Sequence, residues 1–139
     1  MTVYHGDIKE DEPLAWDFNT NSAASAPITL AGSASLAVYK DGGTTQSTAG
    51  LTLTVDLDSV TGLHHVAVVT TDAFYVTGSD YSVVLAAGTV DSISVVGIVV
   101  GWFSIENRSV AAVKTDTAAI LVDTGTTLPA SIATVDTVV

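Results

Sequence analysis

The feature that most constrains the fold is a strict alternation of apolar and polar residues in the middle of the chain. The stretch LTLTVDLDS, residues Leu51–Ser59, places Leu, Leu, Val and Leu at every second position, with Thr and Asp between them. Successive side chains of a strand point to opposite faces of a sheet, so this pattern predicts a strand with one buried and one solvated face.

The same period of two recurs along the chain, and short turn-rich connections separate the segments. Asp41–Gly42 is a strong hairpin signal between two of them. The number of strands and their spacing of roughly 8–14 residues predict a mainly β fold, an immunoglobulin-like antiparallel β-sandwich of about seven strands. We expect the strands at Leu14–Asn19, Ile28–Gly32, Ser33–Lys40, Leu51–Ser59, His64–Thr71, Asp80–Ala87 and Ile93–Ile105.

The chain divides into three predicted parts. Residues 1–13 are interpreted as an N-terminal arm, because their acidic residues Asp7, Glu10, Asp11 and Glu12 favour a solvated segment. Residues 14–107 form the sandwich. Residues 108–139 are predicted to form a short C-terminal helical or coiled-coil segment that mediates oligomerisation.

The most apolar stretch of the chain precedes that C-terminal segment. The run from Ile93 to Phe103 covers about 11 residues, whereas a membrane-spanning helix needs about 20. Its glycines and β-branched residues favour one long strand, Ile93–Ile105. Both faces of this strand are apolar, so we expect the C-terminal segment or a neighbouring subunit to cover one of them. The predicted interface residues here are Val96, Ile98, Val100 and Trp102.

The C-terminal segment carries two short apolar seams with helical spacing. A narrow seam on a short helix is marginal alone, so it needs a partner surface. That surface is either the sandwich of the same chain or copies of the segment in a bundle. We expect the bundle, which makes the protein a homo-oligomer, a trimer. The predicted seam residues are Val110, Val113, Thr117, Ile120, Leu128, Ile132, Val135 and Val139.

Tyr81 begins a predicted strand directly after the turn-rich stretch FYVTGSD. This is the position of a tyrosine corner, in which the phenol bonds to backbone a few residues upstream. The alternative is an ordinary core tyrosine.

No set of residues in the sequence forms a recognisable catalytic centre. His64 and His65 are adjacent on a predicted strand, so they point to opposite faces and do not share a metal. The chain has no cysteine, and we expect no cofactor, no metal and no enzymatic activity. Two alternatives stay open: Asp56 and Asp58 share a strand face that could hold Ca²⁺, and Trp16 or Trp102 could stack on a sugar.

The charge of the chain excludes some classes of partner. The formal net charge is -11, and the cationic residues are Lys9, Lys40, Lys114 and Arg108. A chain this acidic neither neutralises a phosphate backbone nor binds an anionic membrane surface. We therefore expect neither nucleic acid nor membrane as a partner.

Several motifs resemble structural proteins of tailed bacteriophages. They are VYKDG (Val38–Gly42), VTGLHHVAV (Val60–Val68), FYVTGSDY (Phe74–Tyr81) and DTGTTLPA (Asp123–Ala130). The chain is similar to the N-terminal β-sandwich of baseplate upper proteins and of related tail-fibre or head-decoration proteins. The resemblance implies a module that attaches to the virion while a helical, often trimeric, segment leads away from it.

The expected function is that of a non-enzymatic virion protein that oligomerises as a fibre base or as a baseplate or tail component. Its partners are then copies of itself and other virion proteins. A capsid decoration protein, as head cement or head fibre, is the first alternative, and a carbohydrate- or Ca²⁺-binding module is the second. A hydrolase fragment is disfavoured, because no nucleophile and base can be paired.

Overall fold

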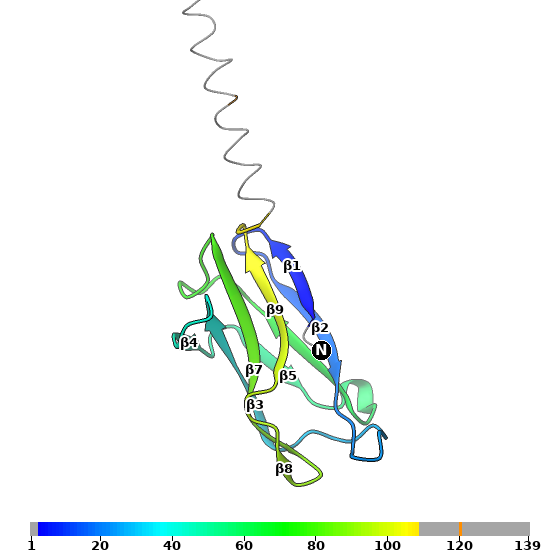
Figure 1. Ribbon diagram of the computed structural model, residues 1–139. Coiled ribbons are helices and arrows are strands. Elements are labelled where there is room, and N and C mark those ends of the chain that lie inside the picture. The colour runs from blue at the N-terminus through cyan, green and yellow to red at the C-terminus, as the bar shows by residue number, and fades with distance from the viewer. Residues whose placement is uncertain (1–2, 109–119, 121–139) are drawn as a thin grey trace, which may run out of the picture.

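The protein folds into two β-sheets that pack face to face, as the computed structural model in Figure 1 shows. The structure describes residues 3–108 and residue 120. The larger sheet has the strand order β1-β9-β7-β3-β4, with β8 beside β7, and the smaller sheet has the order β2-β6-β5. The strands of the larger sheet are β1 (Tyr4–Ile8), β3 (Ala31–Lys40), β4 (Gln46–Ser47), β7 (Ser79–Val90), β8 (Ile93–Ser94) and β9 (Val99–Ile105); those of the smaller sheet are β2 (Leu14–Asn19), β5 (Leu51–Thr54) and β6 (Leu63–Val68). The predicted mainly β fold is confirmed.

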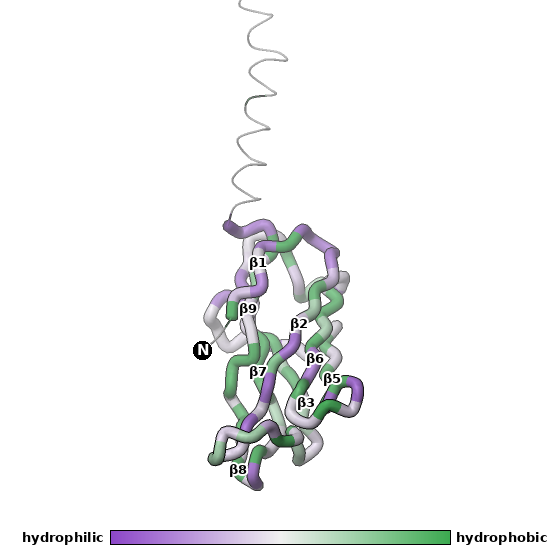
Figure 2. The backbone as a smooth tube through the Cα atoms, turned by 90° about the vertical axis from the view of Figure 1, so that its right-hand side faces the viewer, coloured by the Kyte–Doolittle hydropathy of each residue, from purple (hydrophilic) through white to green (hydrophobic). Residues whose placement is uncertain are grey.

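The core lies between the two layers, which Figure 2 shows with β1, β9 and β7 on one side and β2, β6 and β5 on the other. Strand β6 alternates between buried and half-buried residues along its whole length, and its Val66 and Val68 face the core. The opposing sheet contributes Val38, Tyr81 and Phe103, which are fully buried. Each buried side chain of this size contributes about 1.5–3 kcal/mol to folding, so the period of two in the sequence accounts for the sandwich.

Tyr81 fixes the connection that leads into β7. Its hydroxyl oxygen accepts a hydrogen bond from the backbone N–H of Val76 at 2.7 Å. The same hydroxyl lies 3.3 Å from the carbonyl oxygens of Phe74 and Val76, to which it can donate. The ring of Tyr81 stacks on Phe103, with centroids 5.1 Å apart. One residue thus holds the corner and the centre of the core together.

The long strand predicted at Ile93–Ile105 is wrong, because the chain breaks into β8 and β9. Gly97 has a φ of +91° and its N–H donates to the carbonyl of Leu85. The register of β9 against β7 then shifts, since Val83 pairs with Gly101 while Val84 pairs with Val99. The extra residue, Val100, turns into the core. A bulge of this kind changes which residues share a face, so the two faces assigned from simple alternation do not exist.

Three other predictions need correction. The strand predicted at Ile28–Gly32 is not a separate strand, because Ala31 and Gly32 begin β3 and residues 28–30 are not in a strand. The strand predicted at Leu51–Ser59 ends at Thr54, and a short 3₁₀ turn, η1 (Leu57–Ser59), follows it. The N-terminal arm is wrong for residues 4–8, which form strand β1 and pair in parallel with β9. The sandwich is therefore not purely antiparallel. Strand β1 forms because alternate residues of a short segment can hydrogen-bond along the edge of β9.

Most of the predicted oligomerisation segment lies outside the described residues. This holds for Val110, Val113, Thr117, Leu128, Ile132, Val135 and Val139, whereas Ile120 is described and exposed. In the part of the chain that the structure describes, no helix has the length and apolar character needed to cross a membrane.

Candidate interaction surfaces

The first candidate surface is a cluster at the point where the chain leaves the sandwich. Asp7 of β1 is the centre of it, because its carboxylate accepts hydrogen bonds from the backbone N–H groups of Asn107 at 3.0 Å and Arg108 at 3.2 Å. The same carboxylate accepts a bond from the hydroxyl of the buried Ser104 at 2.6 Å. Strand β1 therefore holds the backbone that follows β9. We call this cluster the exit clamp.

The side chain of Arg108 completes the exit clamp. Its guanidinium donates to the carboxylate of Asp80 at 2.8 Å and lies 5.0 Å from the ring of Trp102. The ring of Tyr4 lies against Trp102, with centroids 4.2 Å apart. An exposed ion pair and a cation–π contact contribute only about 0.5–1 kcal/mol each. Together with the hydrogen bonds that the carboxylate of Asp7 accepts, they fix the direction of the backbone at residue 108.

The second candidate surface lies at the opposite end of the sandwich, on the connection from β7 to β9 (Figure 1). Three large aliphatic residues within six positions are exposed there: Ile93 by 69%, Val96 by 59% and Ile98 by 52%. We call them the apolar tip. Several large apolar side chains exposed on one short connection favour an interaction site.

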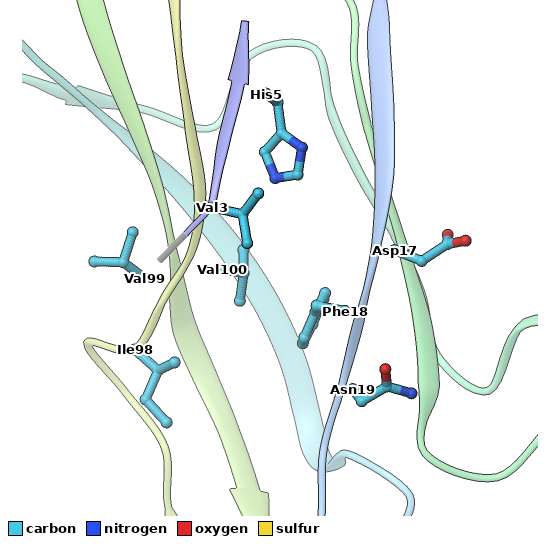
Figure 3. Close-up of a pocket in the computed structure, with 8 residues that line it drawn as sticks. All are labelled: Val3, His5, Asp17, Phe18, Asn19, Ile98, Val99 and Val100. Atoms are coloured by element: carbon cyan, nitrogen blue, oxygen red, sulfur yellow. The ribbon is translucent and has the colours of Figure 1, made fainter. Parts of the chain in front are cut away.

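The third candidate surface is an open groove of about 480 Å³ between the edges of the two sheets, which Figure 3 shows in close-up. Strand β2 forms one wall, and β1 with the start of β9 forms the other. A second groove adjoins it and shares Phe18, Asn19 and Ile98 with it. We call the two together the edge groove. The first is lined by Val3, His5, Asp17, Phe18, Asn19, Ile98, Val99 and Val100.

His5 and Trp16 are stacked beside the edge groove. Their ring centroids are 4.2 Å apart at an interplanar angle of 16°. Trp16 donates from Nε1 to the carbonyl of Val100 at 3.1 Å, whereas Nε2 of His5 is buried and has no hydrogen-bond partner within the described residues. Burial lowers the pKa of His5. A side chain at Gly101 would collide with both rings, so the glycine makes room for this stack.

His64 is a structural residue inside the sandwich. Its Nδ1 accepts the backbone N–H of Asp56 at 3.1 Å, so its Nε2 carries the proton and donates to Thr20 at 2.7 Å. The hydroxyl of Thr20 donates onward to the carbonyl of Ile28. Desolvation lowers the pKa of His64, and the carboxylate of Asp56 opposes this only in part. The ring is therefore held neutral.

We expect the free energy of unfolding to fall as the pH drops below about 6.5, the ordinary pKa of histidine. The unfolded chain takes up a proton at His64 that the folded protein resists, so the stabilisation is complete above this pH and is lost as the pH falls through the lowered pKa. The slope from one such group is at most about 1.4 kcal/mol per pH unit. Urea unfolding at pH 7.5, 6.5 and 5.5 measures it.

One variant separates this effect from the rest of the chain. His64→Gln lowers stability but flattens the curve over this range, with His5 supplying what slope is left. An unchanged slope in His64→Gln contradicts the assignment.

The carboxylates that could have formed a cation site are used otherwise. Asp56 and Asp58 both have positive φ values in the turn after β5, so they do not share a strand face as predicted. The carboxylate of Asp56 accepts bonds from Thr29 and from the N–H of Gly62, and these bonds lower its pKa. Among the described residues no three His, Asp or Glu side chains are placed to share a metal ion.

The structure distributes the predicted interface residues of the last strand over three places. Val96 and Ile98 belong to the apolar tip, Val100 is in the core, and Trp102 is covered by Arg108 in the exit clamp. They do not form one continuous face, because the bulge at Val100 separates them. Trp16 is buried and cannot stack on a sugar. The exit clamp was missed, although the acidic start and the lone Arg108 after an apolar strand were visible signals.

Comparisons with known proteins add no relative. A scan of protein-family models, a search of curated proteins and a search of solved structures found no match.

Proposed function

We propose that the protein is a non-enzymatic structural module of a tailed-phage virion, which attaches to the particle through its sandwich and forms a trimer through residues 108–139. It serves as a fibre base or as a baseplate or tail component. The observation that carries this proposal is the placement of two surfaces at opposite ends of the sandwich: the apolar tip can attach to a partner, while the exit clamp holds the backbone at Asn107 and Arg108. The motif resemblance supports the same assignment.

We also infer that the sandwich is of the immunoglobulin-like type. Strands β2-β6-β5 correspond to one sheet of that fold, and β9-β7-β3 correspond to the other. The hydrogen bond from Val76 to Tyr81 has the geometry of a tyrosine corner. The chain has no cysteine, so the disulfide of antibody domains is absent.

Capsid decoration is the competing function within the same class. The two ends of the sandwich suit a head-attached protein as well as a tail component. Copy number per purified particle separates them, because decoration proteins follow the capsid lattice in many copies whereas a fibre base occurs in few.

The trimer is tested by the mass of the full chain in solution. Light scattering at micromolar concentration should give three chain masses for the wild type. Ile120→Asp puts a charge into the predicted seam and should give monomers, since a buried unpaired carboxylate costs several kcal/mol. Thr115→Asp adds the same charge outside the seam and should leave the trimer intact. A monomeric wild type, or a trimer that survives Ile120→Asp, contradicts the proposal.

A further inference from the structure

We propose that the edge groove binds an extended segment of a partner protein, which adds a strand to the outer edge of β2 and carries Lys or Arg between its apolar residues. This inference rests on the proposed function, because it names the kind of virion protein to which the sandwich attaches. It concerns a different surface from the C-terminal seam, so each can fail without the other.

The edge of β2 defines the shape of the partner. Strand β2 is the first strand of the smaller sheet, and among the described residues its only neighbour there is β6. Within residues 3–108, no backbone hydrogen bond reaches the outer side of residues 14–18. An edge strand of six residues offers its free N–H and C=O groups to a segment of similar length, about 20 Å when extended. Strand addition of this kind satisfies those groups without changing the sandwich.

The walls of the edge groove are mainly apolar. Val3 and Ile98 stand 53% and 52% exposed on the side of β1 and β9, and Phe18 lies opposite them on β2 (Figure 3). The adjoining groove continues the surface with Leu85, Val90 and Val95. A strand added to β2 points every second side chain toward this surface. The partner segment therefore needs apolar residues at alternate positions.

The charges around the edge groove determine which residues the partner segment carries between its apolar ones. Asp17 is on β2 itself; its side chain is 50% exposed, and its Oδ1 lies 2.7 Å from Nδ1 of His65 on the neighbouring strand β6. Neither part of the groove is lined by a lysine or arginine. The lysines and the arginine among the described residues lie at the exit end instead. Lys9 follows β1, Lys40 ends β3 opposite Tyr81, and Arg108 follows β9. A partner with cationic side chains is thus favoured.

The same charges disfavour a second copy of this chain as the occupant. Antiparallel pairing of β2 with β2 of another copy brings two Asp17 side chains onto one short ladder, where like charges destabilise the pair. The segment after Arg108 is also acidic, since residues 109–139 contain Lys114 against Asp116, Asp123 and Asp136.

Titration of the full chain with synthetic peptides tests the proposal. The probe is an eight-residue peptide that alternates Val and Lys, and the matched peptides are one that alternates Val and Glu and one with a central proline. We expect the Val/Lys peptide to bind at least about tenfold more tightly than either, because proline removes a ladder hydrogen bond. The amide NMR signals of residues 14–19 should shift on binding.

Two charge variants locate the site. Asp17→Lys should weaken binding of the Val/Lys peptide about tenfold and improve binding of the Val/Glu peptide, whereas Glu10→Lys, the same charge change at the exit end, should do neither. Equal effects of the two variants, equal binding of the proline peptide, or the absence of NMR shifts in residues 14–19 overturns the proposal. It is also overturned if Asp17→Lys dissociates the trimer, because the groove is then an interface between copies. Loss of peptide binding in an intact trimer leaves the proposed function standing.

Discussion

Gly50→Ala should destabilise the protein by about 3 kcal/mol, although it adds a single methyl group. Gly50 has a φ of +70°, and a Cβ built there lies 2.0 Å from the carbonyl oxygen of Val69. The residues are joined at the end of the β5–β6 ladder, where Val69 donates to Gly50 at 2.9 Å. A left-handed alanine costs about 1 kcal/mol, and forcing the methyl group into packed backbone adds about 1–3 kcal/mol.

Gly42→Ala is the matched control for this prediction. Gly42 has nearly the same φ, +67°, but a Cβ there meets no atom within 4 Å. Its alanine variant should therefore lose only about 1 kcal/mol, the cost of the left-handed backbone. The difference between the two midpoints in urea unfolding measures the collision alone. Equal losses for the two variants show that β5 and β6 are not joined in this way.

The elements that were predicted well are those that the alternation of neighbouring residues defines. Strand β2 occupies Leu14–Asn19, the same residues that the sequence indicates, and β6 starts one residue before the predicted His64 and ends at Val68, three residues before the predicted Thr71. The hairpin turn at Asp41–Gly42 is also local, and both residues have positive φ values. In these segments a few neighbouring residues determine both the period and the turn, so one sequence is sufficient.

The elements that were missed depend on contacts between distant parts of the chain. The bulge at Val100 follows from hydrogen bonds that Leu85 makes with Gly97 and Ile98, and alternation alone does not reveal it. Asp56 leaves the strand pattern because Thr29 and Gly62 hold its carboxylate in a turn. The exit clamp joins Asp7 to Arg108, which are 101 positions apart in the sequence. Its members were visible as residue types, but their proximity was not.

Phe103→Ala should lower the free energy of unfolding by about 3–5 kcal/mol. The side chain is fully buried between the sheets and stacks on Tyr81 at an interplanar angle of 20°. Removing the ring leaves a cavity in the centre of the core, beside the residue that holds the corner before β7. Urea unfolding followed by far-UV circular dichroism measures the loss.

Trp102→Ala is the control for this prediction, because Trp102 is adjacent to Phe103 in sequence and has the larger aromatic side chain. Its ring lies outside the core against Tyr4 and Arg108, so its loss should cost only about 1–2 kcal/mol. It should instead loosen the exit clamp and speed tryptic cleavage after Arg108 in the folded protein. From sequence alternation alone, both faces of this strand were predicted to be apolar, and Trp102 was predicted to lie in an interface between subunits. If Trp102→Ala costs as much stability as Phe103→Ala, the register that follows the bulge at Val100 is wrong, and the surfaces built on it are wrong with it.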